Sequence, residues 1–179
     1  MSGSRQRQKM IRKTQSKDIE KLMPIFSAAK ERLRQRGVDQ WQDGYPDRDI
    51  IAADVENGES YILTDEKDIG ATAVISFRGE PTYDVITGGQ WLTGENTSYA
   101  VIHRIAAAQG EVRRGAATKL LCYAQELCRQ RKIGSIRMDT HKDNDVMQQW
   151  LLKNGFIYCG EITLSDGALR IAFEKVINE

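Results

Sequence analysis

Residues 99–132 constrain the fold of this chain more than any other stretch. They start with the apolar run YAVIHRIAAA, typical of a buried strand, and end in LLCYAQELCRQRK, where small and apolar residues recur at helical spacing. The residues on that helical face are Ala117, Leu120, Leu121, Ala124, Leu127 and Cys128. The stretch therefore predicts a strand, a glycine-containing turn and a helix.

The predicted turn, residues 110–117, places small and basic side chains where the helix begins. The first N–H groups of a helix have no partner inside it, and the helix dipole makes that end positive, so it binds anions such as phosphate. Ala116 and Ala117 stand where a P-loop needs Lys and Ser or Thr, and the dinucleotide pattern G-x-G-x-x-G does not occur. We expect the turn to hold an anion without either motif.

The run VRRGAATKLL, residues 112–121, resembles the acyl-coenzyme A loop of the GCN5-related N-acetyltransferase (GNAT) family, whose pattern is Q/R-x-x-G-x-G/A before a Leu-rich helix. Gly115 and Ala117 match the last two fixed places, whereas Val112 stands where Gln or Arg is usual. Because such a loop binds pyrophosphate mostly through backbone N–H groups, the missing side chain costs less than a missing glycine would. Arg113 and Arg114 are expected to supply the lost charge.

The resemblance also implies a bulge in the strand before the loop, where the small side chains of residues 106–108 allow the pantetheine arm to approach. A second run, residues 144–156, is similar to the family's late motif of an Asn, a helix and Lys-x-Gly-Phe, which packs beside that arm. We therefore expect acetyl-coenzyme A as cosubstrate, and no metal. The residues expected to bind it are Ala107, Arg113, Arg114, Gly115, Ala116, Ala117, Thr118 and Asn144.

Candidate catalytic residues are His141, His103 and Tyr158. His141 follows a predicted strand, and its near-neutral pKa suits proton transfer from an ammonium group, although the cluster of residues 139–144 also suits turn and cap bonds. His103 adjoins Arg104 in an apolar strand, so the two side chains are expected on opposite faces. Asp139 and Asp143 are expected to make turn and cap bonds rather than to act as bases.

The family's usual proton donor to the leaving thiolate is a Tyr seven places after the Asn, and Leu151 occupies that place. Tyr158 and Cys159 are substitutes only because they lie on the strand that follows. A buried structural thiol remains the simpler interpretation of Cys159, because no base or charge that would activate it is evident.

The order of patterns predicts a mixed α/β fold, which resembles the single-domain GNAT fold: a central, mostly antiparallel sheet flanked by helices. We expect a disordered basic leader, residues 1–9, and an N-acetyltransferase domain, residues 10–179. Local signals place Ser16 and Asp47 at helix starts, a kink or split at Pro24 and a helix end at Gly37. We expect an irregular segment at 78–97 and a helix between Asn144 and Gly155. The inner side of that helix is expected to carry Val146, Met147, Trp150 and Leu151. The strands are expected at 10–15, 60–64, 69–77, 99–108, 135–140, 157–164 and 169–176.

Composition limits the function classes. With 179 residues and 40% hydrophobic content, the chain suits one domain with one core. Its net charge of +1 argues against nucleic acid or an acidic membrane surface as main partner. No apolar run is long enough to span a bilayer, so a cytoplasmic protein is expected. The three cysteines do not suit a disulfide framework or a zinc site, and Cys122 and Cys128 are expected in the core.

We therefore expect an enzyme that transfers an acetyl group to a primary amine of a small molecule or peptide. The alternative is a non-catalytic acyl-coenzyme A-binding module of the same fold, favoured by Leu151 and Val112. A nucleic-acid role would rest only on the few charges of the leader. A homodimer is compatible with the pattern. Trp41 and Trp91 stay open between packing and ligand contact.

Overall fold

The computed structural model describes residues 9–65, 67–110 and 115–178. Seven strands of this part form one sheet in the order β1-β2-β3-β4-β5-β7-β6. They are β1 (Met10–Lys13), β2 (Ser60–Thr64), β3 (Ile69–Ser76), β4 (Tyr99–Ala107), β5 (Ser135–Thr140), β6 (Ile157–Thr163) and β7 (Leu169–Val176). Neighbouring strands are antiparallel except for β4 and β5, which are parallel. The expected mixed α/β fold with a mostly antiparallel sheet is confirmed.

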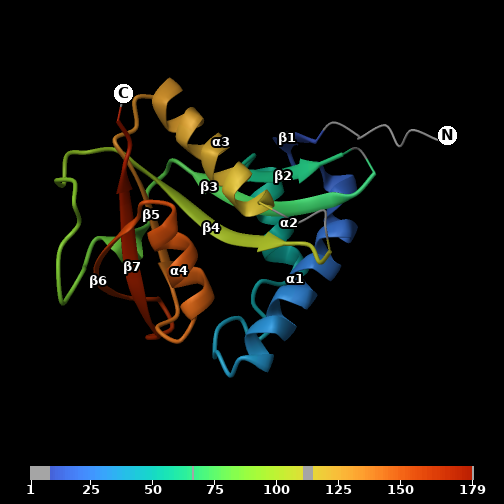
Figure 1. Ribbon diagram of the computed structural model, residues 1–179, viewed down its shortest axis with the longest axis horizontal. Coiled ribbons are helices and arrows are strands. Elements are labelled where there is room, and N and C mark those ends of the chain that lie inside the picture. Colours follow the sequence, from blue (N-terminus) through green and yellow to red (C-terminus); the bar gives the residue numbers. More distant parts are fainter. Residues whose placement is uncertain (1–8, 66, 111–114, 179) are drawn as a thin grey trace.

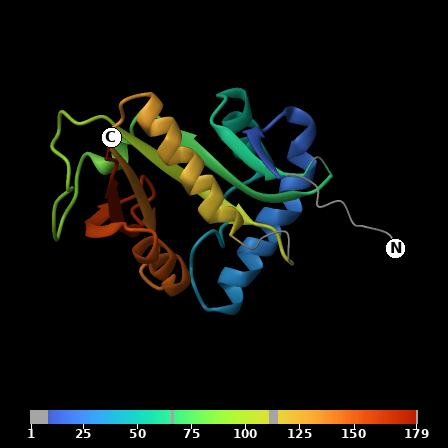
Figure 2. The same ribbon diagram turned by 45° about the horizontal axis from the view of Figure 1, so that its top comes forward.

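Helices cover both faces of the sheet (Figures 1 and 2). On one face, α1 (Ile19–Gln35) and α2 (Arg48–Glu56) pack against Ile62 of β2. On the other face, α3 (Ala116–Gln130) and α4 (Asp145–Lys153) pack with Tyr61, the neighbour of Ile62. Successive strand residues point to opposite faces, so one strand supplies both cores. No helix in the described ranges is long and apolar enough to cross a bilayer.

The ends of the helices test the local signals. Ser16 does not cap α1, because residues 16–18 form a 3-10 turn in which Asp18 accepts a bond from the N–H of Gln15 at 2.8 Å. The helix then runs unbroken through Pro24, so of the expected kink or split the split is wrong. Pro24 lies near the start of the helix on its exposed side, where water can satisfy the carbonyl that loses its N–H partner. Gly37, with φ +70°, ends α1 as expected.

Asp47 and Asn144 cap α2 and α4 as predicted, since each side chain accepts a bond from a backbone N–H of the first turn. Two expectations about helix faces are wrong. Val146 is 54% exposed and does not pack inward, and Cys122 is exposed, whereas Cys128 is buried. Val146 and Cys122 are each next in sequence to a residue that faces the core. One residue corresponds to a rotation of about 100° around the helix axis, so their side chains point away from the core.

The segment between β3 and β4 is irregular, as expected, apart from a 3-10 turn at Pro81–Tyr83. It is held against the sheet by Glu174 of β7, whose side chain is fully buried. This carboxylate accepts bonds from the N–H groups of Leu92 and Thr93, the hydroxyls of Thr93 and Ser135, and Nε of Arg137. The Arg137 guanidinium lies 4.3 Å from the Trp91 ring and 4.0 Å from the Tyr99 ring. A buried ion pair therefore positions the segment that carries Tyr83.

Candidate active site

The centre of the sheet opens where its two parallel strands separate. β4 and β5 pair only at Tyr99–Ser135, Ala100–Ile136 and Val101–Arg137, within the described residues. Beyond these pairs β4 stays with β3 as far as Ala107, and β5 stays with β7 as far as Thr140. The widening gap leaves backbone groups of both strands without a partner strand, as Figure 1 shows between β4 and β5. A ligand can therefore reach the middle of the sheet.

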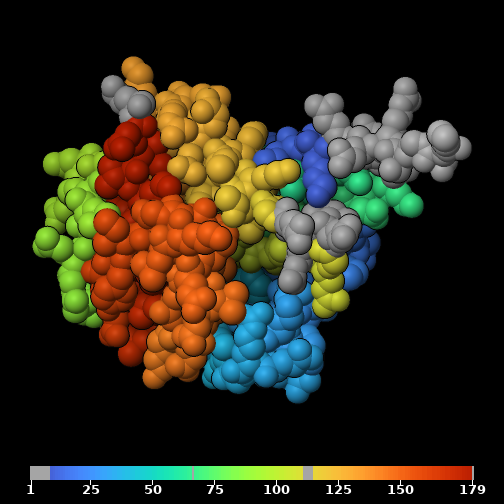
Figure 3. All heavy atoms as spheres, in the orientation of Figure 1, coloured from blue at the N-terminus to red at the C-terminus, as the bar shows by residue number. Residues whose placement is uncertain are grey.

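This opening belongs to a cleft of about 1350 Å³. Residues 115–118 at the start of α3 line one part of it, and residues 164–170 of the β6–β7 hairpin line another. Figure 3 shows the surface hollowed between α4, in orange, and the light-blue end of α1. The cleft thus connects a helix N-terminus with the polar residues on the opposite side of the sheet.

A bulge in β4 shapes the wall of the cleft. Val74 faces His103 and Thr72 faces Ala106, so Ala73 alone stands opposite both Arg104 and Ile105. Arg104 takes a left-handed conformation, with φ +48°. The bulge that the family resemblance implied is confirmed, with Ala106 and Ala107 directly after it and both lining the cleft.

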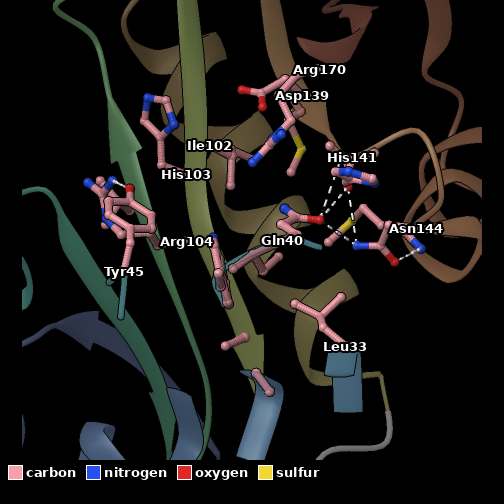
Figure 4. A pocket seen from close by; sticks show the side chains of 18 of the residues that line it. Leu33, Gln40, Tyr45, Ile102, His103, Arg104, Asp139, His141, Asn144 and Arg170 are labelled. Atoms are coloured by element: carbon pink, nitrogen blue, oxygen red, sulfur yellow. Dashed lines mark hydrogen bonds between the residues drawn. The ribbon is translucent and has the colours of Figure 1, made fainter. Parts of the chain in front are cut away.

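The bulge corrects the expectation that His103 and Arg104 point to opposite faces. His103 Nε2 lies 3.4 Å from a Glu80 oxygen, and its ring lies 6.5 Å from that of Tyr83. Arg104 forms an ion pair with Asp54 of α2 at 2.6 Å and donates to the hydroxyl of Tyr45. These partners all lie on the face away from α3, because the extra residue interrupts the alternation of side chains. Figure 4 shows His103, Arg104 and Tyr45 together beside β4.

The start of α3 has the features expected of an anion site. Gly115 occupies the N-cap position with φ +68°, a conformation that side chains other than glycine rarely adopt, and it offers no side chain to cap the helix. Ala116 is fully buried, and Thr118 accepts a bond from the indole N–H of Trp150 at 3.1 Å. Gly115, Ala116, Ala117 and Thr118 all line the cleft, whereas Arg113 and Arg114 lie outside the described residues.

Comparison with known proteins agrees with this geometry. The sequence model of the acetyltransferase (GNAT) family matches residues 20–156. The chain belongs to this family. A GNAT-family acetyltransferase from Streptococcus agalactiae 2603 is 34% identical, with a TM-score of 0.83 and 96% of each chain covered. No curated protein gives a significant match.

More distant solved structures share the fold. A GNAT-family acetyltransferase from Listeria monocytogenes 4b F2365 is 19% identical, with a TM-score of 0.68 and 94% of each chain covered. The ribosomal-protein-alanine N-acetyltransferase from Brucella melitensis is 16% identical, with a TM-score of 0.64 over 93% of this chain and 99% of that one. GNAT proteins in general use acetyl-coenzyme A.

Nothing in the sequence singled out Gln40, which lines the cleft. Its Oε1 atom accepts bonds from the Thr140 hydroxyl at 3.3 Å, the His141 N–H at 3.4 Å and Nδ2 of Asn144 at 3.0 Å (Figure 4). Gln40 lies in the loop after α1, so these bonds tie that loop to the end of β5. A single Gln in a polar loop carries no sequence signal for such a role.

The same bonds define the position of Asn144. Its Nδ2 group donates to Gln40 and Thr140, and its Oδ1 accepts from Met147 N–H. The side chain therefore caps α4 and is 6% exposed. Asn144 lines the cleft, and its contact with coenzyme A remains a prediction.

His141 also lines the cleft, with a side chain that is 14% exposed. Its Nδ1 atom accepts a bond from Asp143 N–H at 3.1 Å, so the neutral ring carries its proton on Nε2. To accept a proton, His141 would have to give up the bond that orients it.

The proton-donor candidates separate in space. Tyr158 is 47% exposed on β6, packs edge-on against Phe173 at 5.9 Å, and is not among the residues that line the cleft. The structure therefore does not bring Tyr158 together with His103 and His141. Leu151 is fully buried in the core, and Cys159 is buried, which raises the pKa of its thiol. Trp41 both packs at 6.0 Å from Phe26 and lines the cleft.

Asp139 differs from its expected role. It makes no turn or cap bond within the described residues, and instead its Oδ2 atom accepts a bond from the Tyr83 hydroxyl at 2.7 Å. The side chain lines the cleft beside Arg170, as Figure 4 shows. Burial raises the pKa of this carboxyl group. The expectation failed because Tyr83 comes from the irregular segment, whose position no local pattern predicts.

The surroundings of Glu80 lower its pKa, whereas those of Asp139 raise the pKa of that group. It accepts bonds from the N–H and hydroxyl of Thr82, at 3.2 and 3.0 Å, and faces His103. The hydrogen bond from His103, followed by those from Thr82, lowers the pKa of Glu80 to about 2. Glu80 is therefore ionised throughout the physiological range.

This lowered pKa predicts a loss of stability in acid. Because the folded pKa lies below the ordinary 4.5, Glu80 contributes fully above pH 4.5, and its contribution disappears as the pH falls toward 2. Urea unfolding at several pH values should show that native protein loses more free energy of unfolding across this window than Glu80→Gln. The exposed Glu56→Gln is the matched control. Equal pH dependence in native protein and Glu80→Gln would contradict the prediction.

Proposed function

We propose that this GNAT protein transfers the acetyl group of acetyl-coenzyme A to a primary amine of a small molecule or peptide. The observation that carries the proposal is the opening between β4 and β5, which joins the uncapped start of α3 to the polar side of the cleft. Phosphates held at α3 would let the acyl end of the thioester pass through the sheet. There it would meet an acceptor beside His103 and Asp139.

The polar side of the cleft supports an amine as acceptor. Carboxyl groups of Glu80 and Asp139 and the imidazole of His103 line it, so an ammonium group can be bound and can lose its proton there. Within the described residues no group of three or more His, Cys, Asp or Glu side chains could hold a metal ion.

A panel of primary amines should separate this function from a non-catalytic binding module. We expect thiol release from acetyl-coenzyme A, followed with a thiol reagent, to exceed the amine-free rate at least about tenfold for one or more amines. Acetyl-coenzyme A should raise the melting temperature whether the protein is a transferase or a binding module, so a thermal shift tests binding alone. A thermal shift without thiol release for any amine would contradict the transferase and favour the binding module.

A further inference from the structure

Resting on the proposed transfer to an amine, we propose that Asp139 takes the proton of the acceptor's ammonium group and that Tyr83 is the residue that positions its carboxylate. Asp139 lies near the end of β5, where it pairs with Ala172 of β7 and its side chain lines the cleft. It therefore stands on a rigid strand at the edge of the opening, not on a loop.

Tyr83 holds one oxygen of this carboxylate and leaves the other available. The phenol is 1% exposed and donates to Oδ2, while Oδ1 accepts no hydrogen bond within the described part of the chain. The Tyr83 ring is fixed among the rings of Trp91 at 5.3 Å and Tyr99 at 6.4 Å, and its carbonyl accepts from the Trp91 indole. A fixed ring with one donor therefore orients Oδ1 for a ligand.

The charged and titratable groups around Asp139 come from every element packed against it. They are Tyr83 and Glu80 of the β3–β4 connection, His103 of β4, Arg170 of β7 and Tyr45 of the α1–α2 loop. Burial raises the pKa of Asp139, Glu80 adds to the rise, and Tyr83, His103 and Arg170 offset only part of it. A carboxylate with a raised pKa is a better proton acceptor than an ordinary one. Tyr83 keeps its own proton, because burial raises its pKa well above 10.

Three carboxylates around this part of the cleft are already engaged, and the other lining carboxylates, Asp39, Asp43 and Asp166, are exposed to solvent. Glu80 accepts bonds from two groups of Thr82 and from His103, and its pKa of about 2 makes it a weak base. Asp54 is paired with Arg104, and Glu59 with Arg78 at 2.7 Å. Of these carboxylates, only Asp139 has both a raised pKa and an oxygen that accepts no hydrogen bond from the described residues.

The proton balance of the step is simple. The ammonium group of the acceptor gives one proton to Asp139, which passes it to solvent, and becomes a neutral amine. The amine nitrogen forms a bond to the thioester carbon, and the carbon–sulfur bond breaks. The nitrogen loses a second proton, and the coenzyme A thiolate gains one. The sum is amide, free thiol and one released proton, with no oxidant or reductant.

The test compares Asp139→Asn, Tyr83→Phe and the matched control Asp84→Asn, whose exposed side chain lies next to Tyr83 outside the cleft. We expect Asp139→Asn to bind acetyl-coenzyme A normally but to lose about 10²- to 10⁴-fold in kcat/KM. Tyr83→Phe removes a donor to the carboxylate, so the acidic limb of the pH profile should move to higher pH. A residue with only a packing role would lower activity at all pH values without moving the limb.

Carbon-13 NMR of labelled Asp carboxyl groups gives a readout that does not need turnover. The resonance that disappears in Asp139→Asn belongs to Asp139. It should titrate at a higher pH than an ordinary Asp carboxyl group, and at a still higher pH in Tyr83→Phe. Two results with active native protein would overturn the role of Asp139 but not the proposed function. In the first, Asp139→Asn keeps its kcat/KM and the acidic limb of its pH profile. In the second, that limb moves only in His103→Gln or His141→Gln. If native protein releases no thiol with any amine, the proposed function is overturned, and the role of Asp139 with it.

Discussion

Replacing Gly115 with Val is expected to abolish coenzyme A binding and to leave the protein folded. A Cβ atom at this position would meet no atom of the described residues within 4 Å, so none of them blocks the new side chain at its root. The left-handed backbone at φ +68° disfavours any L side chain by roughly 1–2 kcal/mol, and a β-branched one more. The helix start must therefore shift, and the new side chain occupies the space in which phosphates would be bound.

The expected loss is at least about 100-fold in affinity, because two hydrogen bonds from N–H groups to a charged phosphate contribute roughly 1.5–3 kcal/mol each. Calorimetry with coenzyme A measures the affinity, and circular dichroism checks the fold. Gly88→Val is the matched control, since Gly88 has the same φ of +68°, is equally open, and does not line the cleft. Normal binding by Gly115→Val would show that the phosphates are not held at this helix.

The largest effect on stability is expected for Glu174→Gln. Burial by itself raises the pKa of Glu174, but hydrogen bonds from Ser135, Thr93 and Arg137 outweigh it, so the folded-state pKa is lowered and the group stays ionised. Removing its charge leaves the buried guanidinium of Arg137 without a counter-ion, which costs about 3–5 kcal/mol in free energy of unfolding. For a chain of this size that corresponds to a fall of roughly 10 °C in Tm.

Urea and thermal unfolding would measure this loss, with the exposed Glu161→Gln of the neighbouring strand as control. The lowered pKa also predicts that native protein loses stability as the pH falls below the ordinary range of a Glu, whereas Glu174→Gln loses less. A loss of under 1 kcal/mol in Glu174→Gln would mean that the ion pair does not anchor the β3–β4 connection.

Local signals in the sequence were enough to place most elements of the fold. The sequence predicted β5 at residues 135–140 after Gly134, and cap residues Asp47 and Asn144 predicted the starts of α2 and α4. The two caps depend on bonds between residues three positions apart, and a strand shows in its local run of residues, so the sequence displays both directly. The start of α3 was predictable because small and apolar residues recur at helical spacing from Ala117 onward, just after Gly115.

The sequence by itself therefore determined the family, the order of elements and the helix start expected to hold the phosphates. The tertiary structure alone decided which polar groups meet in the cleft. Tyr83 reaches Asp139 across 56 positions, and Gln40 reaches Asn144 across 104. The bulge at Arg104 and the buried Glu174 bring such distant groups together, and their effect on proton affinity depends on burial in the folded protein. No local pattern records which side chains share a buried space, because packing between distant segments creates it.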